Sequence, residues 1–380
     1  MNFKKLDDFL DKLTSWKIPG NDCIVIKDGE TVYRHLSGYA DIEAGRKIKG
    51  DETYNVWSCS KPVTCAAALT LYEKGVIELT DPLSDYLPEF ANVKVEHKNS
   101  DGSVDLVPAK NKIKVKDLFS MSSGLSYNVD FPELNEVRKK SNGRCPTRDV
   151  VRAIASSPLE FEPGTHWLYG LSHDVLAGLV EEVSGVSFNE YVTENIFKPL
   201  GMKESTFGSP SEELVSRMAR QYEYNDELGR AVPTDNSVSF KFGPDYHSGG
   251  AGLITTVEDY SKFSYAMANG GLGLNGERIL STRTVALMGQ NAMNETQMKD
   301  INWSNLGGYG YGLGVRTMVT PADGGSNGPA GEFGWGGAAG AWVIIDPVNK
   351  LTLFYAEHLL NSQEPYISPR LRNVLYSCLD

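Results

Sequence analysis

The 380-residue chain contains few cysteines and no long run of apolar residues. Its five cysteines, Cys23, Cys59, Cys65, Cys145 and Cys378, are scattered and never spaced as C-x-x-C. This odd, sparse set excludes a disulfide scaffold and offers no metal-binding cysteine pair, so we expect reduced thiols. No stretch of about 18 apolar residues is present, which argues against a membrane-spanning helix. The first residues also lack the apolar core of a signal peptide, so we expect a cytoplasmic protein.

Acidic residues outnumber basic residues, 49 to 37, which gives a net charge of −12. An acidic surface repels nucleic acids and anionic membranes, so neither is expected as the main partner. The six histidines are not spaced as H-x-x-x-H metal pairs; His166 and His173, for example, are seven residues apart. We therefore expect no metal and no cofactor.

The two ends of the chain predict antiparallel sheet. In residues 23–41 (CIVIKDGETVYRHLSGYAD), two β-rich runs flank Asp28-Gly29, and glycine takes the positive φ that tight hairpin turns require. Residues 340–358 (GAWVIIDPVNKLTLFYAEH) repeat the pattern with Pro347 and Asn349 in the turn. An amphipathic helix is expected from Leu6 to about Trp16. A terminal helix is expected with Ser368 as its cap and Pro369 at its first position.

The middle of the chain is mostly helical in pattern, and several predicted helices end in glycine, as left-handed C-caps do. These segments are 64–75, 116–124, 173–185, 188–201 and 257–271. We expect an α+β fold in which residues 1–80 and 245–380 form a sheet lobe flanked by helices. Residues 81–244 would form a mainly helical inserted lobe, with the active site in the cleft between the two lobes.

The stretch Ser58-Cys59-Ser60-Lys61 precedes an apolar helix. Pro62 is tolerated only near the first helical turn, so this helix must begin close to Ser58. Residues three apart share a helix face, which places Lys61 beside Ser58 and directs Cys59 elsewhere. A serine hydroxyl becomes a nucleophile when a nearby group accepts its proton. The structural alternative is a capping Ser58 with a solvated Lys61, because S-x-x-K occurs about once by chance in a chain of this size.

Six blocks in order carry a family resemblance that covers nearly the whole chain. They are YNVWSCSKPVTCAAALTLYEKGVIELTDPLSDYLPEF, DLFSMSSGL, FEPGTHWLYGLSHDVLAGLVEEVSG, FKPLGMKESTF, GAGLITTVEDYSKF and EFGWGGAAGAWVIIDP. The sequence resembles the serine β-lactamase and penicillin-binding-protein superfamily, whose nucleophile lies in S-x-x-K. It looks most like the class C-like branch that includes family VIII carboxylesterases. The resemblance implies a β-lactamase/transpeptidase-like fold.

By this resemblance, the family's second motif, Y-x-N, falls on Tyr169, Gly170 and Leu171. Its tyrosine is the family's general base, and the charge of Lys61 would favour the phenolate of Tyr169. The alternative is an aromatic residue packed at a helix start. Leu171 stands where the motif has asparagine, so an amide that would bind a substrate acylamino group is missing. Substrate binding there should be more apolar.

The third motif, usually K-T-G or H-x-G, falls on Trp335, Gly336 and Gly337. An indole cannot pair with the carboxylate that a lysine would hold, and this W-G-G variant resembles the esterase branch. The resemblance implies an oxyanion hole formed by the backbone N–H groups of Ser58 and Ala338. The paired glycines would let the substrate lie close to the strand. A plain glycine-rich turn is the alternative.

Two further residues, Trp57 and His247, complete the expected site, and one serine is set aside. The resemblance places His247 near the cleft, and Trp57, Leu171 and Trp335 would make that cleft aromatic and uncharged. Ser326 lies in a G-x-S-x-G pattern, GGSNG, but that nucleophile elbow needs a strand before it and a helix after it. Neither is predicted, so we expect a loop.

The favoured hypothesis is a serine hydrolase that cleaves small carboxylic esters through an acyl-Ser58 intermediate, with Lys61 and Tyr169 moving the proton. A β-lactamase or D-alanyl carboxypeptidase/amidase, an acyltransferase, and a non-catalytic binding relative remain alternatives. The expected partner is a small-molecule ester or amide. The sequence leaves the natural substrate and the oligomeric state open.

Overall fold

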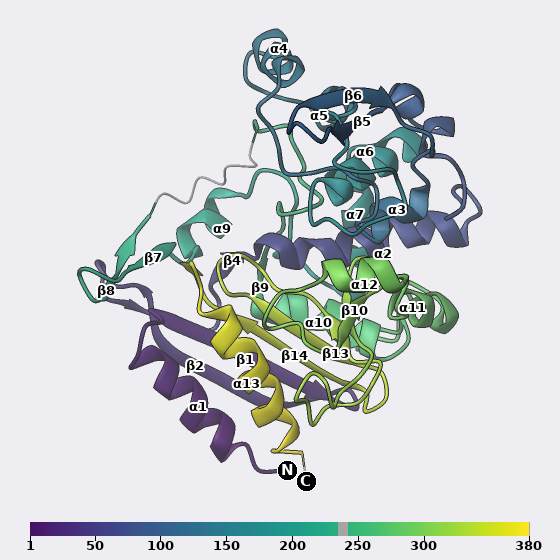
Figure 1. The fold of residues 1–380 in the computed structure, drawn as a ribbon. Coiled ribbons are helices and arrows are strands. Elements are labelled where there is room, and N and C mark those ends of the chain that lie inside the picture. Colours follow the sequence, from purple (N-terminus) through teal and green to yellow (C-terminus); the bar gives the residue numbers. More distant parts are fainter. Residues whose placement is uncertain (235–241, 380) are drawn as a thin grey trace.

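An eight-stranded sheet joins the two ends of the chain. The computed structural model describes residues 1–234 and 242–379. Strand β1 (Gly20–Lys27) pairs with β14 (Leu351–Ala356) in antiparallel direction, and every other neighbouring pair in the sheet is antiparallel too (Figure 1). The strand order is β10 (Tyr309–Tyr311), β11 (Arg316–Met318), β12 (Phe333–Gly334), β13 (Trp342–Asp346), β14, β1, β2 (Glu30–Asp41) and β3 (Arg46–Lys47). The predicted antiparallel sheet built from both termini is confirmed.

Both predicted hairpins form around residues with positive φ. The β1–β2 turn has Asp28 at φ 51° and Gly29 at φ 89°, the left-handed conformation that a two-residue hairpin turn requires. In the β13–β14 turn the left-handed residue is Lys350, at φ 47°. These turns fix which side chains face each side of the sheet.

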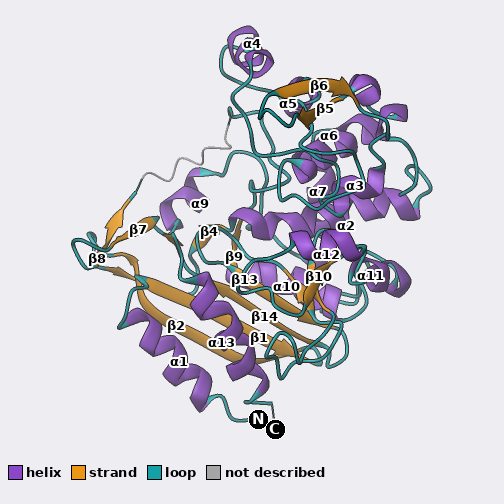
Figure 2. Cartoon of the chain, in the orientation of Figure 1, coloured by secondary structure: helices purple, strands orange, loops and turns teal. Residues whose placement is uncertain are grey.

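Helices cover both faces of the sheet because its buried side chains alternate (Figure 2). On one side, Cys23 and Val25 pack in the same cluster as the apolar faces of α1 (Lys4–Thr14) and α13 (Glu364–Tyr376). On the other side, Ile24 and Ile26 pack in the cluster that contains α10 (Val257–Ala268). The predicted N-terminal helix is thereby confirmed.

The predicted start of the terminal helix is wrong. Helix α13 begins at Glu364, with Pro365 in its first turn, and Pro369 lies inside the helix. Both prolines fit a first turn by local criteria, and the sequence did not distinguish them. The earlier start places Glu364 on a helix that packs against the sheet.

Helix α2 (Ser60–Glu73) follows a 3-10 turn at Trp57–Cys59 and is buried along most of its length. It packs against α6 (Ser172–Ser184), among the helices in the upper part of Figure 1. The other helices are α3 (Val115–Phe119), α4 (Pro132–Lys140), α5 (Thr147–Ile154), α7 (Phe188–Val192), α8 (Lys198–Leu200), α9 (Glu212–Arg217), α11 (Thr282–Met288) and α12 (Glu295–Asp300), with 3-10 turns at Leu83–Asp85 and Pro88–Asn92 and a π-helical turn at Thr193–Phe197.

Three smaller sheets complete the chain. They are β4 (Thr53–Asn55) with β9 (Ile254–Thr256), β5 (Lys94–Lys98) with β6 (Val104–Pro108), and β15 (Leu359–Leu360) with β7 (Tyr222–Asn225) and β8 (Arg230–Pro233). Because β7 pairs with β15, part of the range 81–244 contacts the C-terminal part of the chain. The division into two lobes at residues 80 and 245 stays our prediction, and residues 235–241 within it lie outside the described residues.

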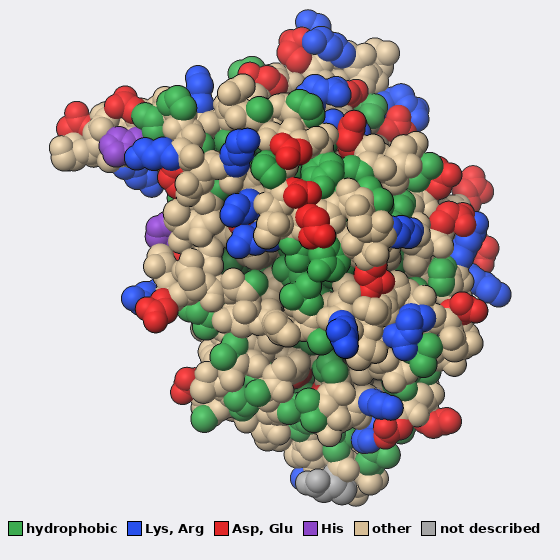
Figure 3. Space-filling model, turned by 90° about the vertical axis from the view of Figure 1, so that its right-hand side faces the viewer, with side chains coloured by type: hydrophobic (Ala, Val, Ile, Leu, Met, Phe, Trp, Pro, Cys, Tyr) green, Lys and Arg blue, Asp and Glu red, His purple; other side chains and the backbone are tan. Residues whose placement is uncertain are grey.

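On the face shown in Figure 3, acidic and basic side chains are interspersed and are not separated by sign. In the described part of the chain, no helix is both long enough and apolar enough to cross a membrane. All five cysteines are buried and free, as expected for reduced thiols. The G-x-S-x-G segment around Ser326 lies in turns outside any helix or strand, as predicted.

Candidate active site

Ser58 lies in the 3-10 turn before α2, and Lys61 lies in the first turn of that helix. The Lys61 Nζ donates a hydrogen bond to Ser58 Oγ at 3.1 Å. Cys59 points away from this pair, with its thiol 3.7 Å from the backbone oxygen of Trp335. Burial raises the pKa of Cys59 well above that of an exposed thiol, which keeps it protonated and unreactive.

The Lys61 side chain is 0% exposed, and its ammonium group makes three hydrogen bonds. Besides Ser58, the acceptors are the Tyr127 hydroxyl at 3.2 Å and the Gly250 carbonyl oxygen at 2.8 Å. An ammonium has three N–H donors, so these partners use all of them. The sequence did not predict Tyr127 or Gly250 as site residues.

The backbone at Gly250 is held by a buried carboxylate, because the Gly250 N–H donates a hydrogen bond to Asp174 Oδ1 at 3.4 Å. Asp174, at the start of α6, accepts hydrogen bonds from the Tyr246 hydroxyl at 2.7 Å and the Ser248 hydroxyl at 2.6 Å. A Cβ atom at Gly250 would lie 2.5 Å from an oxygen of Asp174, so only glycine permits this approach. The signal in the sequence was the run His247-Ser-Gly-Gly, whose glycines mark a close backbone approach.

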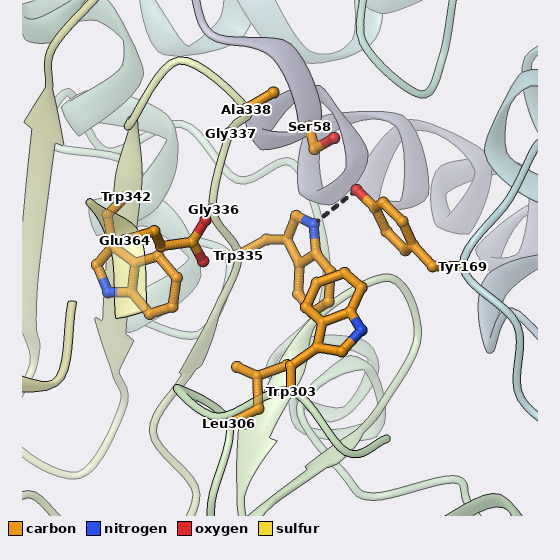
Figure 4. Close-up of a pocket in the computed structure, with 10 residues that line it drawn as sticks. All are labelled: Ser58, Tyr169, Trp303, Leu306, Trp335, Gly336, Gly337, Ala338, Trp342 and Glu364. Carbon is orange, nitrogen blue, oxygen red and sulfur yellow. Dashed lines mark hydrogen bonds between the residues drawn. The ribbon is translucent and has the colours of Figure 1, made fainter. Parts of the chain in front are cut away.

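Tyr169 meets both Lys61 and the W-G-G segment. The Trp335 Nε1 donates to the Tyr169 hydroxyl at 3.0 Å (Figure 4). Lys61 Nζ lies 4.5 Å from the Tyr169 ring centroid. Lys61 therefore contacts the ring face of Tyr169, because its hydrogen bonds go elsewhere. Tyr169 therefore contacts a hydrogen-bond donor at its oxygen and a cation at its ring face.

Tyr127 is the other phenol beside Lys61, and its environment differs. Burial, with a further contribution from neighbouring Tyr169, raises the pKa of Tyr127 well above that of an ordinary tyrosine. Tyr127 therefore stays protonated, and its oxygen serves as a neutral acceptor for Lys61.

The two glycines after Trp335 are required by protein packing. A Cβ atom at Gly337 would lie 2.3 Å from the backbone oxygen of Val56, and one at Gly336 would lie 2.7 Å from the Trp342 ring. The glycines therefore let the W-G-G loop approach the turn that carries Ser58. Within the loop, Gly337 N–H donates to the Ala341 oxygen at 2.7 Å and Gly340 N–H donates to the Gly337 oxygen at 2.8 Å. These bonds do not use the amide of Ala338.

A cavity of about 200 Å³ opens beside Ser58. Its lining residues, shown in Figure 4, are Ser58, Tyr169, Trp303, Leu306, Trp335, Gly336, Gly337, Ala338, Trp342 and Glu364. The cavity wall is aromatic, as expected, but it is not uncharged. Glu364 contradicts that part of the prediction, and the sequence also missed Trp303, Leu306 and Trp342.

Three predicted substrate-binding residues lie outside this cavity lining. Leu171 caps α6 and is 2% exposed, in the hydrophobic core. The His247 Nδ1 lies 3.5 Å from an oxygen of Glu181. Trp57 precedes Ser58 with φ 47°, uncommon for a bulky residue, and its Nε1 donates to the Gln221 side-chain oxygen at 3.1 Å.

In the described ranges, no group of three or more His, Cys, Asp and Glu side chains is placed to hold a metal ion. The two most perturbed histidines are structural. Burial lowers the pKa of His173 to about 3 and that of His358 to about 4, so both are neutral at physiological pH.

A buried carboxyl lies beneath the W-G-G loop and makes stability depend on pH. Glu357 is 1% exposed and accepts a hydrogen bond from the Tyr355 hydroxyl, and its side chain blocks any Cβ at Gly340. Burial raises the pKa of Glu357 from 4.5 to about 8, with a smaller contribution from Glu364. Between these values the folded state binds more protons than the unfolded state, so stability is lost as pH rises through this window.

Glu357→Gln is expected to reduce that loss, because glutamine stays neutral in both states. The difference in free energy of unfolding between variant and wild type should grow by roughly 1.4 kcal/mol per pH unit within the window. Urea unfolding at several pH values between these limits measures it. Parallel stability curves for the two proteins would show that Glu357 ionises normally in the folded state.

Comparisons with known proteins find a matching family, related sequences and a similar solved structure. A model of the Beta-lactamase family matches residues 6–375. Protein Rv1367c of Mycobacterium tuberculosis is 31% identical, over 84% of this chain and 80% of its own. Esterase EstB of Burkholderia gladioli is 27% identical, over 98% and 95%. The solved structure of EstCE1, described as a hydrolase with promiscuous acyltransferase activity, has a TM-score of 0.78 at 22% identity, over 99% and 97%.

Proposed function

Because the chain belongs to the Beta-lactamase family, we propose that it is a serine hydrolase that cleaves small carboxylic esters through an acyl-Ser58 intermediate. The observation that carries this proposal is the 3.1 Å hydrogen bond from buried Lys61 to Ser58 Oγ, at the wall of a cavity that Tyr169 also lines. The name of the relative Esterase EstB supports the same reaction class.

In acylation, Ser58 Oγ attacks the ester carbonyl carbon while Tyr169, acting as the phenolate, takes the hydroxyl proton. The new bond joins Ser58 Oγ to the acyl carbon. The bond from that carbon to the alcohol oxygen then breaks, and the proton passes from Tyr169 to the departing alcohol. Lys61 remains charged and stabilises the anionic phenol oxygen through space.

The oxyanion that forms during the attack would be held by the amides of Ser58 and Ala338, which line the same cavity. In deacylation, Tyr169 removes a proton from water and the resulting hydroxide attacks the acyl carbon. The bond from that carbon to Ser58 Oγ then breaks, Ser58 takes the proton back from Tyr169, and the carboxylic acid leaves.

The cavity favours esters over β-lactams. Trp335 stands where a family lysine would hold a substrate carboxylate, and its Nε1 is already bonded to Tyr169 at 3.0 Å. Glu364 adds a negative charge at the cavity wall, which disfavours an anionic substrate further. We propose a location in the cytoplasm on the basis of the free, buried thiols.

The reaction class is tested with p-nitrophenyl butyrate beside a chromogenic cephalosporin. We expect ester turnover to exceed cephalosporin turnover by more than about 100-fold in kcat/KM, because only the cephalosporin brings a carboxylate to Trp335 and Glu364. Cephalosporin turnover far above ester turnover would reverse the assignment. Adding n-butanol and measuring butyl butyrate distinguishes acyl transfer to an alcohol from hydrolysis, since both use the same acyl-enzyme.

A further inference from the structure

The cavity beside Ser58 is lined by one acidic side chain, which forms no ion pair with the part of the chain that the structure describes. Glu364, at the first position of α13, is the only Asp, Glu, Lys or Arg among the residues that line the described cavity. Its Oε1 accepts a hydrogen bond from the Asn305 side-chain amide at 2.8 Å. Within the described residues, no cationic group lies within ion-pair distance of it.

The charge of Arg316 acts on Glu364 from a distance, but Arg316 already forms an ion pair with another carboxylate. Arg316 pairs with Glu332 at 3.0 Å, and its guanidinium lies 3.8 Å from the Trp342 ring centroid. Burial raises the pKa of Glu364, while the Asn305 hydrogen bond and the charge of Arg316 oppose this effect. A partly buried carboxylate without a counter-ion is costly, and a ligand cation would remove that cost.

The aromatic walls of the same cavity suit a cation as well. The indole rings of Trp303 and Trp335 lie 5.9 Å apart, and Tyr169 lies 5.2 Å from Trp303, between centroids. Tryptophan faces attract cations more strongly than any other side-chain ring, and they hold the methyl groups of a substituted ammonium by apolar contact. Figure 4 shows the Glu364 carboxylate beside Gly336 and Trp335, on the side of the cavity away from Tyr169.

The position of Glu364 relative to the reacting carbonyl is fixed by the W-G-G loop. A Cβ atom at Gly336 would lie 3.0 Å from Glu364 Oε1, so the carboxylate touches this glycine. Gly336 and Ala338 are two residues apart, which limits the distance between their Cα atoms to about 7 Å. A cationic group on Glu364 would therefore be separated from the ester carbonyl by a spacer of a few bonds.

We propose that this cavity selects esters that carry a substituted ammonium group, with Glu364 as its counter-ion and the indoles of Trp303 and Trp335 as its aromatic walls. The proposal rests on the ester hydrolysis proposed above. The ammonium group could belong to the alcohol or to the acyl part of the ester, and the two kinds of substrate share the same recognition chemistry.

Two substrate pairs that differ only in charge test the proposal. Butyrylcholine is compared with 3,3-dimethylbutyl butyrate for the alcohol side. The p-nitrophenyl esters of 4-(trimethylammonio)butyrate and 5,5-dimethylhexanoate are compared for the acyl side. In wild type, we expect kcat/KM for the cationic ester to exceed that for its neutral isostere about tenfold in one of the pairs.

Glu364→Gln keeps the shape of the side chain and an oxygen for Asn305, and it should reduce that preference to about twofold or less. Glu227→Gln is the matched control, because Glu227 is an exposed glutamate in the turn between β7 and β8. Glu227→Gln removes the same charge from the protein outside the cavity lining. Its preference for the cationic ester over the neutral isostere should equal that of wild type. Equal losses on both esters in Glu364→Gln, or no preference in wild type, would overturn the proposal.

A binding measurement separates this inference from the proposed function. Tetramethylammonium should quench tryptophan fluorescence saturably in wild type, and Glu364→Gln should weaken its binding about tenfold, whereas 3,3-dimethylbutanol should bind both proteins alike. If no ester is cleaved but this pattern holds, the proposed hydrolysis fails and the cation site stands. If esters are cleaved and tetramethylammonium binds both proteins equally, the cation site fails alone.

Discussion

Replacing Ser58 with alanine is expected to lower kcat/KM for p-nitrophenyl butyrate by on the order of 10⁵-fold, because the atom that forms the acyl bond is lost. Lys61 donates to that atom at 3.1 Å, and no other Ser, Thr or Cys is among the residues that line the described cavity. Steady-state kinetics measures the loss. Intact-mass spectrometry after a fluorophosphonate probe should show one adduct on wild type and none on Ser58→Ala.

Ser326→Ala is the matched control, since Ser326 occupies the G-x-S-x-G pattern that the sequence also offers. Its hydroxyl accepts a hydrogen bond from Gly328 N–H at 3.0 Å inside a turn, and it does not line the cavity. We expect wild-type labelling and activity within a few-fold. An adduct that survives in Ser58→Ala would contradict the nucleophile assignment, and a wild type that never labels would favour the non-catalytic binding relative.

Tyr169→Phe is expected to lower kcat by about 10²- to 10⁴-fold with little change in KM, because in the proposed mechanism the phenol oxygen moves the proton in both steps. The ring itself would remain, 4.5 Å from Lys61 Nζ, so the variant removes the hydroxyl and little of the packing. The Trp335 Nε1 loses its acceptor in this variant. Pre-steady-state kinetics of acylation, with steady-state kcat and KM, measures the effect.

Tyr127→Phe tests whether Tyr127 is the general base or only a hydrogen-bond acceptor for Lys61. The raised pKa of Tyr127 keeps it protonated, so the variant removes no proton acceptor. It costs Lys61 one hydrogen bond at 3.2 Å and also removes the side-chain hydrogen bond between Tyr127 and Tyr169. We expect a loss of about tenfold or less in kcat, in keeping with one hydrogen bond to a charged group. A larger loss for Tyr127→Phe than for Tyr169→Phe would reverse the two assignments.

Local patterns predicted much of the fold. The alternation of apolar residues around Asp28-Gly29 specified the β1–β2 hairpin, because the turn and both strands are neighbours in sequence. The start of α13 could not be chosen locally. Pro365 and Pro369 both suit a first turn, and packing against the sheet decided for the earlier one. That error hid Glu364, the charged residue of the cavity.

In the candidate site, too, some features followed from local sequence and others depended on tertiary packing. The i, i+3 spacing was enough to place Lys61 beside Ser58, and the family resemblance brought Tyr169 and Trp335 into consideration. It also suggested Leu171 and His247, whose side chains the structure places outside the cavity lining. A motif specifies where the backbone passes, whereas the direction of each side chain depends on its neighbours.

By itself, the sequence determined the helix that begins near Ser58, the neighbouring lysine and the two hairpins, because each depends on torsions and contacts within a few residues. Only the tertiary structure decided that Tyr127 and Gly250 complete the hydrogen bonds of Lys61, and that Glu364 faces the cavity. Those groups come from distant segments that meet only when long loops close. Loop closure is driven by the burial of the whole core, so no hydrophobic periodicity within a single segment predicts which loops will meet.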